Sequence, residues 1–201
     1  AMNDADFPVA RVLAGVAAAE AAGFDRIKIN CVVKRGMNEG ALVELVERFR
    51  GTGHVVRFIE FMDVGVTNRW RLDQVVPAAE IVARIGAVHP LEPLEPNYRG
   101  EVARRFRLAD GSAEIGVIAS VTQPFCGDCT RARLSADGRL FTCLFAAVGT
   151  DLRTPLRAGA DDAELAARIA GIWQTREDRY SELRAGSPPA ATKAEMSYLG
   201  G

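Results

Sequence analysis

Residues 26–33 (RIKINCVV) and 55–62 (VVRFIEFM) are the two runs that indicate the fold. The first alternates apolar and polar side chains, which is typical of a strand with one buried face. Between the two runs, Leu42, Leu45 and Phe49 recur at helical spacing. A strand, a helix and a second strand within about 30 residues form the βα repeat of a parallel sheet or barrel. The sequence therefore predicts an α/β chain.

Further elements are expected on both sides of this unit. A helix should begin near Asp6 and bury an apolar stripe, and another should cover residues 78–85. Prolines in residues 87–99 indicate a linker or covering loop. The remaining expected elements are a hairpin with strands 104–108 and 114–121, a hairpin with strands 131–135 and 139–145, and a helix over 163–173 that starts with a capping box at Asp161 and Glu164. The stripe of the first helix comprises Val9, Val12, Leu13 and Val16.

The composition excludes several classes of protein. The chain has 201 residues, of which 48% are hydrophobic and 25% charged, and its net charge is −1. No apolar run approaches the roughly 20 residues of a membrane span. A nucleic-acid-binding protein would show a strong basic excess, and the first residues lack the layout of a secretory signal. We therefore expect a cytoplasmic protein that binds neither membranes nor nucleic acid.

Three of the four cysteines form a group. Cys126 and Cys129 lie on one tight turn, and Cys143 lies on the return strand of the Asp137-Gly138 hairpin. The hairpin brings the three sulfurs together, so a metal site is expected; the alternative is three unconnected buried cysteines. An iron–sulfur cluster needs no fourth protein ligand, whereas structural zinc does. The spacing favours a cluster with one open iron, and zinc remains open if Asp128 supplies an oxygen.

Basic side chains accompany this group. If residues 130–133 are extended, Arg131 and Arg133 share one face beside the metal, where two guanidiniums suit a polyphosphate or carboxylate. The alternative is a solvated edge strand whose arginines discourage aggregation. In the first strand, Lys28 and Asn30 should face a lumen, where Lys28 would bind an anion or simply reach solvent. Cys31 falls on the opposite, packed face.

These residues make the chain resemble the C-terminal part of the GTP 3′,8-cyclase family, radical S-adenosylmethionine (SAM) enzymes of molybdenum cofactor biosynthesis. The matching stretches are 6–9 (DFPV), 28–30 (KIN), 33–36 (VKRG), 57–62 (RFIEFM), 125–134 (FCGDCTRARL), 137–138 (DG), 143–145 (CLF) and 200–201 (GG). The resemblance implies the C-terminal portion of a partial TIM-type (β/α) radical SAM barrel over 1–95. An antiparallel-strand domain for an auxiliary cluster and GTP over 96–180 and a flexible tail over 181–201 would follow.

The same resemblance assigns roles to residues. Those implied as ligands of an auxiliary [4Fe-4S] cluster are Cys126, Cys129 and Cys143. Those implied as contacts of GTP are Lys28, Arg131, Ala132 and Arg133. Met62 matches a SAM-contacting position, Arg57 would lie in the same lumen, and Gly200 and Gly201 would enter the active site together with the catalytic Arg131 and Arg133.

The implied reaction converts GTP to (8S)-3′,8-cyclo-7,8-dihydroguanosine 5′-triphosphate. It begins when a 5′-deoxyadenosyl radical removes the ribose 3′ hydrogen. The product would pass to a cyclic pyranopterin monophosphate synthase, and a homodimer is possible in this family.

One feature of the family is missing from the sequence. The Cys-x-x-x-Cys-x-x-Cys motif for the second [4Fe-4S] cluster, which cleaves SAM, does not occur in these 201 residues. We therefore expect this portion alone to hold the auxiliary cluster and to be inactive in radical formation. The alternatives are another radical SAM maturase with an auxiliary cluster, or a non-enzymatic zinc-binding module.

Overall fold

The computed structural model describes residues 7–184 and 193–199. Its helices and strands are α1 (Val9–Ala21), β1 (Lys28–Val33), α2 (Leu42–Phe49), β2 (Val55–Glu60), the 3-10 turn η1 (Leu72–Gln74), α3 (Ala78–Gly86), β3 (Leu91–Leu94), β4 (Arg104–Leu108), β5 (Glu114–Ile118), the 3-10 turn η2 (Cys126–Asp128), β6 (Arg133–Leu134), β7 (Arg139–Phe141), β8 (Thr150–Asp151), α4 (Arg153–Arg157), α5 (Asp162–Gln174) and α6 (Tyr180–Leu183). None of the helices in this part of the chain is long and apolar enough to cross a membrane.

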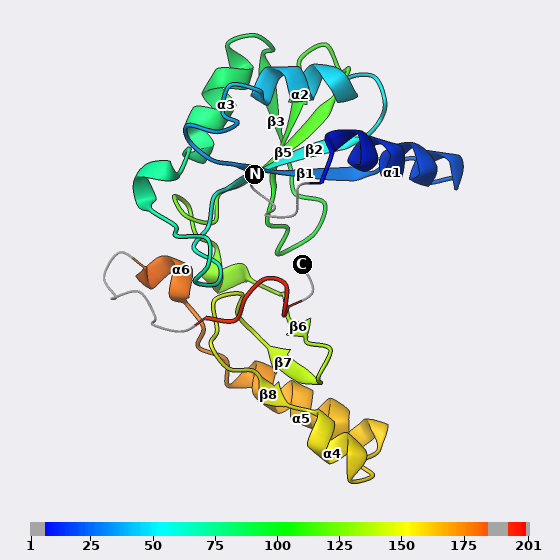
Figure 1. Ribbon diagram of the computed structural model, residues 1–201, viewed down its shortest axis with the longest axis vertical. Helices are drawn as coiled ribbons and strands as arrows, with labels where there is room; N and C mark the ends of the chain where they lie inside the picture. The colour runs from blue at the N-terminus through cyan, green and yellow to red at the C-terminus, as the bar shows by residue number, and fades with distance from the viewer. Residues whose placement is uncertain (1–6, 185–192, 200–201) are drawn as a thin grey trace.

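A five-stranded mixed sheet forms the larger part of the molecule (Figure 1). Its strand order is β1-β2-β5-β4-β3; the pairs β1–β2 and β2–β5 are parallel, and the pairs β5–β4 and β4–β3 are antiparallel. The predicted α/β class is therefore confirmed. The boundary expected between residues 95 and 96 falls inside this sheet, because β3 on one side of it pairs with β4 on the other.

The two faces of the sheet differ in polarity. Helices α2 and α3 pack on one face, where the core contains buried residues such as Phe58, Ile81 and Ile115. Cys31 packs against this core, as the alternation predicted. Lys28 and Asn30 are exposed on the opposite face, and the register places Arg57 beside Asn30 on that face. The Arg57 Nε donates to the Asn30 Oδ1 at 2.8 Å.

Two expectations for this part of the chain are wrong. Residues 91–94, expected within a linker, form the edge strand β3, which accommodates Pro93 because an edge strand leaves one row of backbone groups unpaired. In α1 no residue is buried, and only Leu13 and Val16 of the expected stripe pack against the core, whereas Val9 is 70% exposed. The expected start at Asp6 lies outside the described residues.

A smaller three-stranded sheet, β6-β7-β8, lies beyond the larger sheet together with α4 and α5 (Figure 1). The second hairpin and the capping box of α5 are confirmed: the Asp161 side chain accepts from the Glu164 N–H, and the Glu164 side chain accepts from the Asp161 N–H. Residues 193–199 pack here as well, because Ala194 and Leu199 join a second apolar cluster. Residues 193–199 of the expected flexible tail are therefore packed against the rest of the chain in this structure.

A buried carboxylate ties the larger sheet to the segment that follows β5. The Glu60 side chain, at the end of β2, is 0% exposed. It accepts backbone hydrogen bonds from Ala78 N at 2.7 Å, Val121 N at 2.7 Å and Thr122 N at 2.9 Å, and one from the Thr122 hydroxyl. One side chain thus accepts hydrogen bonds from the backbone at the start of α3 and from the segment that leads to the cysteine turn, residues 126–129.

Replacing Glu60 with leucine is expected to destabilise the protein strongly. The change leaves three backbone N–H groups without their acceptor, and each buried orphan costs about 1–3 kcal/mol. A loss of about 3 kcal/mol or more would lower Tm by roughly 6–12 °C in a protein of this size. Thermal unfolding followed by circular dichroism measures the change in Tm. Glu60→Gln, which keeps an acceptor oxygen, should lose less, and equal losses for the two variants would contradict the explanation.

Candidate functional site

The three grouped cysteines line one cavity. Cys126 lies in η2, the Cys129 N–H donates to the Cys126 carbonyl at 3.2 Å, and Cys143 lies in the turn after β7. We call this cavity the cysteine cavity; its lining includes Met62, Ser120, Phe125, Cys126, Cys129, Arg131, Arg133, Thr142, Cys143, Phe145, Arg176 and Asp178. All four cysteines of the chain are free thiols. The structure thus brings together the three cysteines, both arginines and Met62, from three separate segments.

The thiols of this cavity differ electrostatically. Burial would raise the pKa of the Cys129 thiol, but hydrogen bonds from the backbone and guanidinium of Arg131 hold that pKa below its ordinary value. The Arg131 Nη2 lies 3.5 Å from the Cys129 Sγ. Burial raises the pKa of the Cys143 thiol, and the neighbouring Asp178 acts in the same direction. A cationic ligand would offset the cost of holding Cys143 as a thiolate.

The two arginines lie beside the sulfurs, as the sequence predicted. The Arg131 guanidinium lies 5.1 Å from the centre of the Phe125 ring, and its buried Nε has no hydrogen-bond partner among the described residues. Arg133 is half-buried, and burial and the charge of Arg131 lower its pKa. Two adjacent cations with an unused donor fit an anionic ligand. Ala132 between them is exposed.

A third arginine, Arg176, follows α5 and was not predicted from the sequence. Arg176 Nη1 donates to the Cys129 carbonyl at 2.5 Å, and its Nε forms an ion pair with Asp178 at 3.4 Å. The Asp178 carboxylate in turn accepts from the Thr142 hydroxyl at 2.6 Å. Residues 176–178 therefore join the cysteine turn to the turn that carries Cys143.

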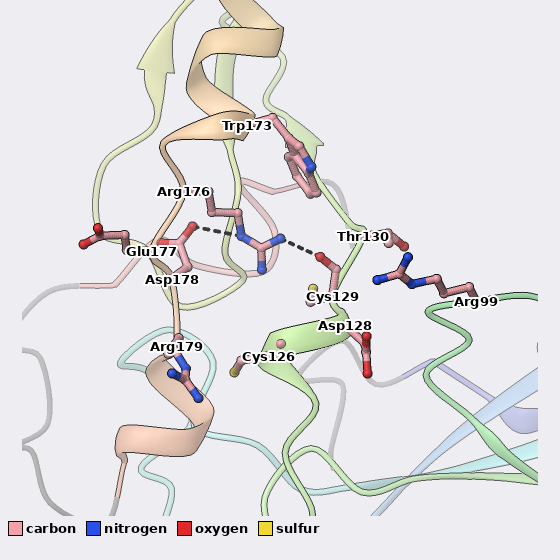
Figure 2. Close-up of a pocket in the computed structure, with 11 residues that line it drawn as sticks. Arg99, Cys126, Asp128, Cys129, Thr130, Trp173, Arg176, Glu177, Asp178 and Arg179 are labelled. Atoms are coloured by element: carbon pink, nitrogen blue, oxygen red, sulfur yellow. Dashed lines mark hydrogen bonds and ion pairs between the residues drawn. The ribbon is translucent and has the colours of Figure 1, made fainter.

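Behind the cysteine turn lies an outer pocket of about 580 Å³. Figure 2 shows its lining: Arg99, Cys126, Gly127, Asp128, Cys129, Thr130, Trp173, Arg176, Glu177, Asp178 and Arg179. Cys126 and Cys129 line both this pocket and the cysteine cavity, so these two residues form a wall between the spaces. Asp128, considered as an oxygen ligand, lines the outer pocket and is not among the residues that line the cysteine cavity.

The other predicted site residues lie elsewhere. Lys28 and Arg57 line a separate pocket on the open face of the sheet, of about 250 Å³. The structure does not bring these two residues into the cysteine cavity. Gly200 and Gly201 lie outside the described residues.

The three thiols fit the thiolate ligands of an iron–sulfur cluster. Zinc–sulfur bonds of about 2.3 Å would hold three sulfurs within roughly 4 Å of one another. Among the described residues, no three Cys, His, Asp or Glu side chains are placed to hold one metal ion. Both histidines are engaged elsewhere, His54 with Glu20 at 2.8 Å and His89 with Glu47 at 2.7 Å. The three thiols that line the cysteine cavity stand there together with one carboxylate, Asp178.

Comparison with known proteins identifies the family. The Molybdenum Cofactor Synthesis C family matches residues 54–182. A GTP 3′,8-cyclase of Acidothermus cellulolyticus is 52% identical over 225 aligned residues, which cover 100% of this chain and 62% of that protein. A GTP 3′,8-cyclase of Xanthomonas axonopodis pv. citri is 55% identical over 193 residues, covering 96% of this chain and 57% of that protein.

The chain spans 62% and 57% of the length of these two curated relatives. The family match includes β2, the cysteine turn, both arginines, Cys143 and α5. The residues that line the cysteine cavity all lie within the matched range of 54–182. The chain therefore belongs to the Molybdenum Cofactor Synthesis C family.

Proposed function

We propose that this chain supplies the auxiliary [4Fe-4S] cluster and the GTP site of a radical SAM GTP 3′,8-cyclase, which acts in molybdenum cofactor biosynthesis. The observation that carries the proposal is the cysteine cavity itself. Three thiols and two arginines, predicted from the sequence as metal ligands and anion contacts, line the same cavity. The relatives named GTP 3′,8-cyclase support the same substrate and reaction.

In this proposal Cys126, Cys129 and Cys143 hold the cluster. When bound, the cluster would supply an open iron at which the guanine of GTP could coordinate. The Arg131 hydrogen bonds to Cys129 favour the thiolate form that a metal ligand requires. Arg133, with the unused donor of Arg131, binds the triphosphate and fixes its orientation.

The five-stranded sheet has its own part in the proposal. Strands β1, β2 and β5, which pair in parallel, would belong to the C-terminal part of a (β/α) barrel. Met62, just past the end of β2, would contact SAM. Lys28 and Arg57 on the open face would contact GTP or line the lumen that SAM and GTP share. A second cluster for SAM cleavage would come from the remainder of the whole protein, and the catalytic Gly200 and Gly201 would follow the packed segment 193–199.

The test uses the full-length protein that contains this chain, reconstituted anaerobically. We expect roughly eight iron atoms with matching sulfide, for two [4Fe-4S] clusters, and conversion of GTP to the 3′,8-cyclised nucleotide in the presence of SAM and a reductant. About four irons together with one zinc would identify the alternative zinc module. Two clusters without consumption of GTP would indicate a radical SAM maturase of another substrate.

A further inference from the structure

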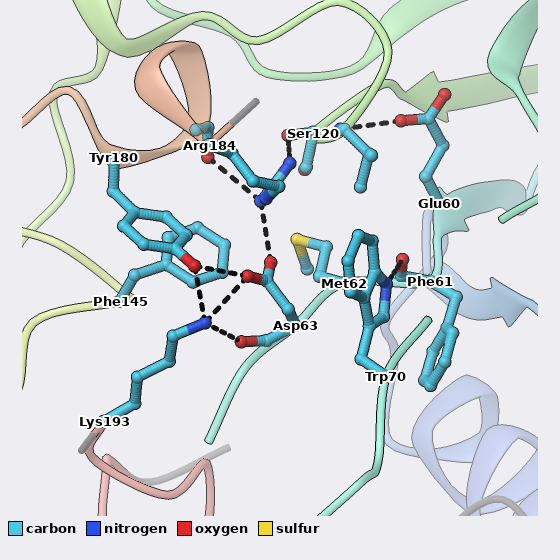
Figure 3. A network of polar contacts seen from close by, with 12 residues as sticks. Glu60, Phe61, Met62, Asp63, Trp70, Ser120, Phe145, Tyr180, Arg184 and Lys193 are labelled. Atoms are coloured by element: carbon cyan, nitrogen blue, oxygen red, sulfur yellow. Dashed lines mark hydrogen bonds and ion pairs between the residues drawn. The ribbon is translucent and has the colours of Figure 1, made fainter. Parts of the chain in front are cut away.

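A network of charged and aromatic side chains joins the C-terminal segment 193–199 to the end of β2. At its centre lies Asp63, whose side chain is 10% exposed. The Lys193 Nζ donates to the Asp63 Oδ2 at 2.7 Å and to the Asp63 carbonyl at 2.8 Å. The Tyr180 hydroxyl donates to Asp63 Oδ2 at 2.5 Å, and the Arg184 Nη2 lies 2.9 Å from the other carboxylate oxygen, Oδ1. Figure 3 shows Tyr180, Arg184 and Lys193 converging on Asp63.

The same network contacts the wall of the cysteine cavity. Asp63 directly follows Met62, which lines the cavity, and the Arg184 Nη1 donates to the carbonyl of Ser120, which also lines it. Tyr180 stacks on Phe145, another lining residue, with ring centres 4.6 Å apart. The position of Lys193 is therefore linked through Asp63 to the cavity.

Further contacts fix the segment beyond Lys193. The Glu195 carboxylate accepts from Val66 N at 2.8 Å and from the Thr67 hydroxyl at 3.0 Å. Gly65 leaves room for it: a Cβ at Gly65, whose φ is +66°, would lie 2.1 Å from the Glu195 Oε2. The Tyr198 hydroxyl donates to Asp137 at 2.8 Å, on the hairpin that carries Arg133.

Burial indicates that Lys193 is the main anchor of these contacts. Its side chain is only 4% exposed, and its Nζ lies 4.5 Å from the centre of the Tyr180 ring. A lysine buried to this degree is retained only where a carboxylate and hydrogen-bond acceptors compensate its lost hydration. Burial would raise the pKa of Asp63, but the hydrogen bonds from Lys193 and Tyr180 outweigh it and keep the pKa lowered.

We propose that Lys193, with Glu195, is a positioning residue that holds the C-terminal segment against the cysteine cavity through Asp63. The inference rests on the proposed function, because the segment leads directly to Gly200 and Gly201, to which that function gives a catalytic role. Lys193 touches neither thiol nor arginine of the cavity in the contacts described above. It acts through the segment.

The experiment uses hydrogen exchange and turnover of the full-length protein. In Lys193→Met, amides of residues 194–199 should exchange about tenfold faster while peptides of β2 and β5 keep their rates, because local opening raises exchange only in its own unit. Asp63 keeps Arg184 as its counter-ion, so the variant should fold. Glu195→Ala should show the same local effect, and Arg157→Met, which removes an exposed cation of α4, should show none.

Turnover tests the functional half of the inference. For Lys193→Met we expect kcat to fall at least about tenfold and the KM for GTP to change by less than about twofold, since misplacement of a catalytic segment lowers the rate without weakening substrate binding. Lys193→Arg should restore most of kcat. Three outcomes would each overturn the inference. The first is unchanged exchange at residues 194–199, and the second is an equal increase of exchange in every peptide. The third is faster exchange at 194–199 with an unchanged kcat. Cyclised nucleotide formed by the unsubstituted protein decides the proposed function separately.

Discussion

The variant Cys143→Ala is expected to lose one of the two clusters of the full-length protein. Its iron content should fall from roughly eight to roughly four atoms, because the remaining two thiols cannot retain a four-iron cluster. Conversion of GTP should stop. Reductive cleavage of SAM should continue, since the second cluster would lie outside this chain. Iron and sulfide analysis with electron paramagnetic resonance measures the loss of the cluster. Detection of 5′-deoxyadenosine measures the cleavage of SAM.

Cys31 provides the matched control. It is also a free, half-buried thiol, but it packs against the core of the larger sheet. Cys31→Ala also removes one thiol group, but at a position outside the cysteine cavity. This variant should retain both clusters. Equal iron losses in the two variants would show that the iron depends on general packing and would refute Cys143 as a ligand.

Removal of both cavity arginines should weaken GTP binding, and this is the second largest effect that we predict. A hydrogen bond to a charged group contributes about 1.5–3 kcal/mol. Loss of two such contacts in Arg131→Ala plus Arg133→Ala therefore predicts an increase of roughly 10²–10⁴-fold in the Kd for GTP. Anaerobic calorimetry on the cluster-loaded protein measures this change.

Two controls separate phosphate binding from other effects of the arginines. Arg131 also contacts the Cys129 sulfur, so its loss can disturb the cluster, whereas Arg133→Ala alone tests the phosphate contact more directly. The double variant Arg157→Ala plus Arg168→Ala changes the net charge equally at two exposed positions on α4 and α5. An unchanged GTP affinity in Arg133→Ala with full iron content would contradict the assigned role.

Local patterns in the sequence predicted much of the fold. Strands β1 and β2, helix α2, both hairpins and the α5 capping box depend on residues close together in the chain, and these expectations match the structure. The insertion of β5 between β2 and β4 was not predictable in this way. It depends on pairing between strands far apart in sequence, and no periodicity records which strand becomes the neighbour. Pro93 indicated a loop because proline is tolerated only at a sheet edge, and the sequence does not reveal where that edge lies.

The residues of the candidate site likewise divide into those that local sequence patterns predicted and those that they did not. Cys126, Cys129, Arg131 and Arg133 lie within one short motif, and a hairpin returns Cys143 to them, so the sequence was sufficient to predict their proximity. Arg176 and the Asp63 network were not predicted, because Arg176 contacts Cys129 and Asp63 contacts Lys193 across long stretches of the chain. Lys193, for example, contacts Asp63 across 130 positions. A lysine in an Ala- and Pro-rich stretch carries no local signal that it will be buried.

The second apolar cluster has a consequence for the order of events during synthesis. Cys143 packs against the same cluster as Ala194 and Leu199, close to the end of the chain. Translation proceeds from the N-terminus, so the larger sheet is complete on the ribosome before residues 193–199 emerge. The apolar surroundings of Cys143 are therefore complete only after residues 193–199 have been synthesised and packed.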